Sequence, residues 1–96
     1  MSGLEKIRLQ RERILSVAAR HGAESLRVFG SVALAADSPD SDIDFLVSMR
    51  PGRDLFDVVA LKRELDSLLQ QPADIVTDEE LSPHLRQRIL NEAVAV

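Results

Sequence analysis

Three aspartates and a glycine–serine pair are the residues of this chain whose types and spacing can do chemistry. Gly30 and Ser31 end one apolar run, and after ten further residues Asp42 and Asp44 open a second apolar run. Like charges on one face of a strand repel each other, and each is costly to bury unless something neutralises it. A divalent metal ion is the usual neutralising group, and a glycine–serine turn before a helix suits a phosphate. The pattern therefore indicates a metal-dependent nucleotide site.

Asp74 is the candidate for a third metal ligand. It lies near the start of another apolar run, residues 73–77, and a strand there could lie beside that of Asp42 and Asp44. Three carboxylates at one end of a sheet would complete a two-metal site, and magnesium suits it because it prefers a few carboxylates plus phosphate oxygens and water. The acidic residues 78–80 compete for this role, but they precede a capped helix and are better interpreted as first-turn charges.

Each of these residues also has a structural interpretation. Asp42 and Asp44 could be ordinary aspartates at a loop-to-strand boundary, although the Gly-Ser pair at this spacing favours the metal site. Three basic residues, Arg50, Arg53 and Lys62, could contact phosphate, but a solvated role is favoured for each. The site hypothesis therefore depends on the aspartates and the glycine–serine turn.

The periodicity of apolar residues predicts the elements that position these side chains. Helices are expected over 4–20, over 55–70 and from Pro83 to about Ala93, and strands over 26–29, 42–48 and 73–77. The helix between the second and third strands allows a parallel crossover, whereas the connection between the first and second strands permits either orientation. The expected architecture is α/β, with a small mixed β-sheet and helices packed on its apolar face.

Composition limits the classes of function. Ninety-six residues make one domain, 1–96, and the absence of cysteine excludes disulfides and thiolate zinc sites. No stretch resembles a signal peptide or a bilayer span, so we expect a soluble cytoplasmic protein with no membrane partner. The net charge of -4 and the three aromatic residues, all Phe, disfavour direct nucleic-acid binding. A small triphosphate carried by a metal ion is not disfavoured.

At this point the motifs resemble a known family. Gly30-Ser31, the Asp42-Ile43-Asp44 triplet and the later strand at 73–76 are similar to the polymerase-beta-type nucleotidyltransferase superfamily. Within it the chain resembles the minimal nucleotidyltransferases, the MNT or MntA-type antitoxins that are paired with HEPN-domain toxins. The resemblance covers nearly the whole chain and includes the closing segment 89–94.

The resemblance implies a nucleotidyltransferase fold and a chemistry. Members transfer a nucleoside monophosphate from a triphosphate to a hydroxyl with magnesium and release pyrophosphate. In the minimal antitoxins the resemblance implies AMP transfer from ATP to a tyrosine of the partner HEPN toxin, which is thereby neutralised. Carried over by residue, Gly30 and Ser31 would hold the triphosphate, and Asp42 and Asp44 would hold both metal ions. Asp74 would hold the catalytic metal and help to deprotonate the acceptor.

One segment departs from the family pattern. After the glycine–serine pair the pattern runs any residue, alanine, arginine, glycine, whereas here Val32 and Ala33 are followed by Leu34 and Ala35. The loss of a positive side chain beside the phosphate turn leaves an alternative open, a weak or inactive member that neutralises its partner by complex formation. A small-molecule acceptor is disfavoured because the chain has no second domain to enclose one.

Overall fold

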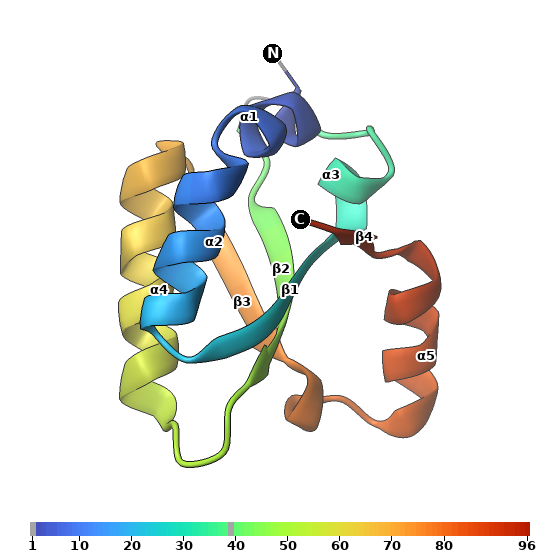
Figure 1. The fold of residues 1–96 in the computed structure, drawn as a ribbon. Helices are drawn as coiled ribbons and strands as arrows, with labels where there is room; N and C mark the ends of the chain where they lie inside the picture. Colours follow the sequence, from blue (N-terminus) through green and yellow to red (C-terminus); the bar gives the residue numbers. More distant parts are fainter. Residues whose placement is uncertain (1, 39) are drawn as a thin grey trace.

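The centre of the fold is a four-stranded mixed sheet with strand order β3-β2-β1-β4 (Figure 1). The structure is a computed structural model that describes residues 2–38 and 40–96. The strands are β1 (Ala23–Phe29), β2 (Ile43–Met49), β3 (Ala73–Thr77) and β4 (Val94–Ala95). Strands β2 and β3 are parallel, as the intervening helix predicts, and β1 is antiparallel to both β2 and β4. The orientation that the sequence left open is therefore antiparallel.

The helices lie on both sides of this sheet. They are α1 (Gly3–Leu9), α2 (Arg11–Arg20), α3 (Gly30–Ala33), α4 (Leu55–Leu69) and α5 (Pro83–Glu92), with a 3-10 turn η1 (Asp78–Glu80). Helices α2 and α4 cover one face, and α5 lies across the sheet from them, against α3 and β1 (Figure 1). The predicted α/β architecture is confirmed. Over the described residues, no helix is long and apolar enough to cross a bilayer.

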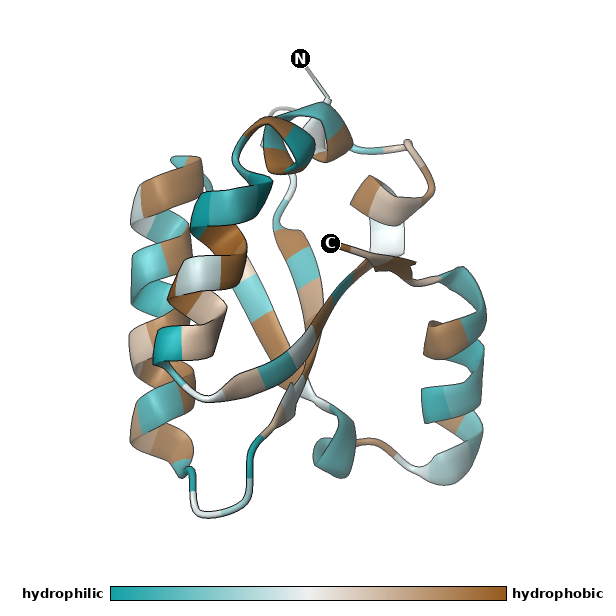
Figure 2. Cartoon of the chain, viewed as in Figure 1, coloured by the Kyte–Doolittle hydropathy of each residue, from teal (hydrophilic) through white to brown (hydrophobic). Residues whose placement is uncertain are grey.

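The core lies between the sheet and the pair α2 and α4. Alternate strand residues point into it, so Val28 on β1 and Phe45 on β2 are almost fully buried, as are Leu61 and Leu65 on α4. Burial of each such side chain contributes about 1.5–3 kcal/mol. Figure 2 shows this pattern as apolar residues that run along the central strands and recur along α2 and α4. The opposite face of the sheet carries Asp44 and Asp74 at one end, next to apolar residues such as Leu46, which is also almost fully buried.

The first predicted helix, over 4–20, is wrong as a single element. The chain turns at Gln10, which has φ -111 and ψ 18, and this turn separates α1 from α2. The bend directs α1 toward α3, where the backbone N–H of Gly3 donates to the Asp37 carboxylate at 3.0 Å. Helical periodicity continues through the bend because Ile7 and Ile14 are both buried, so it gave no signal of the break.

The predicted boundaries also differ from the observed ones by one to three residues at the ends of other elements. The first strand begins at Ala23 rather than Leu26, and the second begins at Ile43, so Asp42 lies just before it. The last helix ends at Glu92, one residue short of Ala93, because the chain then pairs with the free edge of β1 as β4. Long-range strand pairing decides such ends, and local sequence patterns do not report it.

Candidate active site

The turn that leaves β1 places Gly30 and Ser31 at the rim of the sheet. Helix α3 begins at Gly30 directly after the extended Phe29, and its third residue, Val32, is fully buried in the core. Val32 therefore fixes this single helical turn against the sheet. Ser31 lies in its first positions, where backbone amides have no partner within the helix, as the sequence predicts.

The pairing of three strands brings the aspartates to the same end of the sheet. Asp44 lies opposite Phe29 on β1 and opposite Asp74 on β3. Both side chains lie on the face away from the core, because their neighbours Ile43 and Ala73 are buried in it. Asp44 is partly buried, whereas Asp42 and Asp74 are exposed. The predicted neighbouring strand for Asp74 is confirmed.

Gly30 is in close contact with Asp44. A Cβ atom added at Gly30 would lie 3.3 Å from Cγ of Asp44 and closer still to its carboxylate oxygen Oδ2. Gly30 also has φ +71, in the left-handed region that side chains disfavour. Glycine is therefore required here both by the backbone conformation and by the neighbouring carboxylate.

Two side chains outside the motifs hold the strands of the site in place. Oδ1 of Asp66 on α4 accepts the backbone N–H of Ala73 at 2.6 Å, which fixes the start of the strand that carries Asp74. Nε2 of Gln71 donates to the carbonyl of Ser41 at 2.6 Å and so ties down the loop that leads into β2. These positioning residues were missed because contacts between distant segments leave no local pattern in the sequence.

The electrostatics of the site fit a divalent cation. Burial raises the pKa of Asp44 above its ordinary value, and the charges of Asp74 and then Asp42 raise it further. In the part of the chain that the structure describes, no three His, Cys, Asp or Glu side chains are already set around one metal position. The donor set nevertheless offers only carboxylate oxygens that repel one another, and magnesium prefers such ligands.

The other acidic and basic candidates lie elsewhere or are already paired. Residues 78–80 form η1 at the opposite end of β3 from Asp74, and Asp78 accepts a hydrogen bond from Ser48 Oγ at 2.6 Å. On and beside α4, Arg53 pairs with Asp57 at 3.2 Å, and Lys62 pairs with Asp66 at 3.0 Å. Arg50 lies exposed at the turn after β2.

The departure from the family pattern is visible in the backbone. Leu34 follows α3 with 61% of its surface exposed, so no charged group stands at this position beside the turn. Ala35, where the pattern has glycine, has φ 56 and lies in the left-handed region. This conformation costs a non-glycine residue about 1–2 kcal/mol. The turn thus keeps the geometry that glycine favours although glycine is absent.

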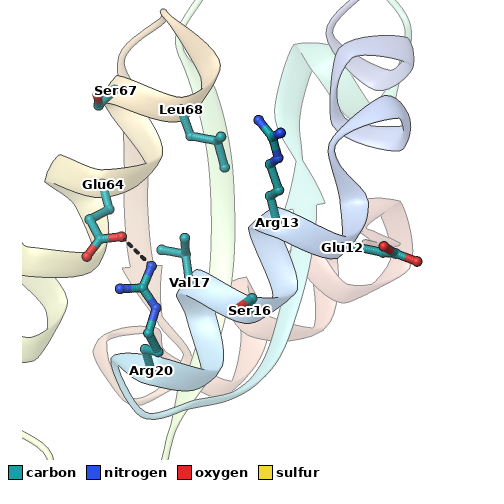
Figure 3. Close-up of a pocket in the computed structure, with 8 residues that line it drawn as sticks. All are labelled: Glu12, Arg13, Ser16, Val17, Arg20, Glu64, Ser67 and Leu68. Carbon is teal, nitrogen blue, oxygen red and sulfur yellow. Dashed lines mark hydrogen bonds and ion pairs between the residues drawn. The ribbon is translucent and has the colours of Figure 1, made fainter.

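A groove of about 510 Å³ lies between α2 and α4, away from these aspartates (Figure 3). Val17 and Leu68 line it together with an ion pair between Arg20 and Glu64, whose atoms Nη2 and Oε2 lie 2.8 Å apart. Glu64 also contacts Nε2 of His21 at 2.8 Å, and these contacts join the two helices. None of the predicted site residues lines this groove, which is the seam between two packed helices.

Comparison with known proteins defines the class of this one. The nucleotidyltransferase domain family matches residues 8–96, and the chain belongs to that family. A Methanocaldococcus jannaschii protein named "Putative protein adenylyltransferase MJ0435" is 40% identical over 86 residues, which are 90% of this chain and 92% of that protein.

Solved structures agree with this assignment. One described as a "putative minimal nucleotidyltransferase" is 47% identical, with a TM-score of 0.90 and coverage of 100% of this chain and 97% of that one. A toxin–antitoxin with AMP-PNP is 22% identical, with a TM-score of 0.75 over 88% of this chain and 69% of that chain. A Shewanella oneidensis complex of a tri-AMPylated HEPN toxin with an MNT antitoxin is 21% identical, with a TM-score of 0.69 over 92% and 69%. The last two share the fold.

The contact between Gly30 and Asp44 predicts a specific loss of stability. Gly52 also has a positive φ, +88, but a Cβ there would meet nothing within 4 Å. Gly52→Ala should therefore lower the free energy of unfolding by about 1 kcal/mol, from the backbone conformation alone. Gly30→Ala should lower it by about 1 kcal/mol more, because the carboxylate must move. Urea denaturation measures both. The additional loss of stability in Gly30→Ala should disappear when Asp44 is also changed to Ala. Equal losses in Gly30→Ala and Gly52→Ala would contradict a close contact between Gly30 and Asp44.

The raised pKa of Asp44 predicts how stability changes with pH. Between the ordinary value of 3.8 and the raised value, the folded state binds more protons than the unfolded state, so the free energy of unfolding falls as pH rises. Asp44→Asn should therefore be more stable than wild type at pH 7, and the difference should vanish below about pH 4. Asp57→Asn is the control with the opposite sign, since backbone and Arg53 hydrogen bonds lower the pKa of Asp57. Thermal denaturation across pH measures the stability of both variants. If Asp44→Asn is less stable than wild type at pH 7, the raised pKa of Asp44 is refuted.

Proposed function

We propose that this nucleotidyltransferase transfers AMP from ATP to a hydroxyl group, a tyrosine of a partner HEPN toxin, and thereby acts as its antitoxin. The relative that is 40% identical carries a protein adenylyltransferase name, and complexes of MntA-type antitoxins with HEPN toxins share the fold. Residues 1–96 are proposed to form one such domain, since a single core cluster underlies the sheet.

The observation that carries the proposal is the row formed by Asp44 and Asp74 beside Gly30. Adjacent strands place the two carboxylates opposite each other, and a Cβ at Gly30 would displace the Asp44 carboxylate. Two unneutralised carboxylates in register are destabilising in a purely structural sheet. Asp42 adds a third negative charge that acts on Asp44. A site for a cation and a phosphate accounts for all three features.

The proposed reaction assigns a role to each residue. Asp42 and Asp44 would hold two magnesium ions, and Asp74 would hold one of them. When bound, magnesium neutralises phosphate charge and lowers the pKa of an attacking hydroxyl. The acceptor oxygen attacks the α-phosphorus of ATP, the bond from that phosphorus to the bridging oxygen breaks, and pyrophosphate leaves with the electron pair. Asp74 receives the proton of the hydroxyl, while Gly30 and Ser31 bind the triphosphate through the start of α3.

A second candidate function rests on Leu34. With an apolar, exposed side chain beside the turn, the chain could neutralise its partner by stable complex formation, with weak or absent transfer. The two functions differ in what the aspartates contribute. Complex formation leaves neutralisation intact when Asp42 and Asp44 are changed to Asn, whereas transfer requires both carboxylates.

Substitution of the aspartates tests the proposed transfer. With labelled ATP, magnesium and a HEPN toxin partner, Asp42→Asn and Asp44→Asn should each reduce labelling of the toxin at least about 100-fold, because each removes a metal ligand. Removal of magnesium with EDTA should stop labelling. Asp78→Asn is the matched control, since this carboxylate lies at the opposite end of β3, and it should label at the wild-type rate.

Two outcomes would contradict transfer at the site of Asp42 and Asp44. Wild-type protein that neutralises the toxin without labelling it would favour complex formation. Labelling that persists in Asp44→Asn at the wild-type rate would show that the reaction occurs at another site. Mass spectrometry of the labelled toxin identifies the acceptor side chain.

A further inference from the structure

Arg27 stands on the aspartate face of the sheet, the side on which α5 lies against β1, and it is close to the aspartate row. Its neighbours Leu26 and Val28 are both buried in the core, so the Arg27 side chain lies on the opposite face. Phe29, two residues further along the same face of β1, is directly opposite Asp44. A distance of about 7 Å along the strand therefore separates Arg27 from the aspartate row.

The segments that supply the site contain no other basic residue near the row. Residues 30–49 and 71–85 contain no Lys or Arg, although they carry the glycine–serine turn and all three aspartates. Across the four strands, each of which lies within the described residues, Arg27 is the single Lys or Arg. A triphosphate bound beside three carboxylates therefore meets protein positive charge on the sheet at this one position.

The guanidinium of Arg27 has no assigned role within the fold. Over residues 2–38 and 40–96, no hydrogen bond or ion pair engages it, whereas Arg20 and Arg53 both pair with carboxylates. It is also absent from the groups that shift the pKa of Asp44. Its side chain is partly buried on the strand, and no nitrogen of it is a buried atom without a partner, so the five N–H donors are accessible from outside the chain.

We propose that Arg27 binds the phosphate groups of the nucleoside triphosphate, an inference that rests on the proposed transfer function. A planar guanidinium matches two phosphate oxygens at once, and such charge-assisted hydrogen bonds are the strong ones. Arg27 thus supplies, from β1, a positive charge that the turn lacks at Leu34. The polyphosphate is expected to run from the turn at Gly30 along β1 toward Arg27.

Binding of a substrate analogue that cannot release pyrophosphate tests this assignment. Calorimetry with α,β-methylene ATP and magnesium compares wild type with Arg27→Ala, Arg27→Lys and Arg11→Ala. Arg27→Ala should raise Kd by about 10- to 100-fold, because it removes hydrogen bonds to charged phosphate. Arg27→Lys should be intermediate, since it keeps the charge without the planar fork. Arg11→Ala, an exposed change on α2, should bind as wild type does.

The outcomes separate this assignment from the proposed function. If wild type fails to bind the analogue with magnesium, the proposed function itself is overturned, and the role of Arg27 with it. If wild type binds and Arg27→Ala binds equally well, the role of Arg27 alone is overturned. NMR titration with adenosine should show no difference between wild type and Arg27→Ala, because adenosine has no phosphate; an equal weakening for adenosine would show a structural role. If Arg27→Ala does not fold, Arg27→Gln decides by the same criteria.

Discussion

The pairing of Asp44 with Asp74 across neighbouring strands is the constraint on which the site depends. The parallel register of β2 and β3 holds the two carboxylates opposite each other, and Asp42 adds a third charge. Partial burial, and then repulsion from Asp74 and Asp42, raise the pKa of Asp44, so ionised Asp44 opposes folding at neutral pH. The same arrangement lowers the free energy of a bound divalent cation, because the cation removes that repulsion. Stability of the free protein and affinity for a metal are therefore opposed at this row.

The rest of the fold maintains this unfavourable row. Val32 is buried in the core and fixes the turn, which brings Gly30 against Asp44. On the other side, Asp66 of α4 accepts the N–H of Ala73 and fixes the first residue of β3. The core between the sheet and helices α2 and α4 supplies the stability that the carboxylates oppose. Helices α2 and α4 cover the face away from the aspartates, whereas α5 lies on the aspartate side, against α3 and β1 (Figure 1).

The sequence predicted the strands and helices better than it predicted where they begin and end. The spacing of Asp42 and Asp44 indicated one face of a strand, and the helix predicted over 55–70 begins at Leu55, where Asp54 accepts the N–H of Phe56 at 3.0 Å. The bend at Gln10 and the edge strand β4 could not be predicted, since long-range packing decides both. Arg27 carried a usable signal, as a lone charge between two buried strand residues. Gln71 carried none, because it acts on a loop thirty positions away.

Replacement of magnesium by paramagnetic manganese gives the most direct test of the metal site. Manganese bound with α,β-methylene ATP should broaden the backbone amide signals of Gly30, Ser31, Asp44 and Asp74 most strongly in an NMR spectrum. The broadening should be lost in the Asp44→Asn variant. Broadening centred instead on the acidic turn at 78–80, or unchanged in Asp44→Asn, would contradict a cation site built on Asp44 and Asp74.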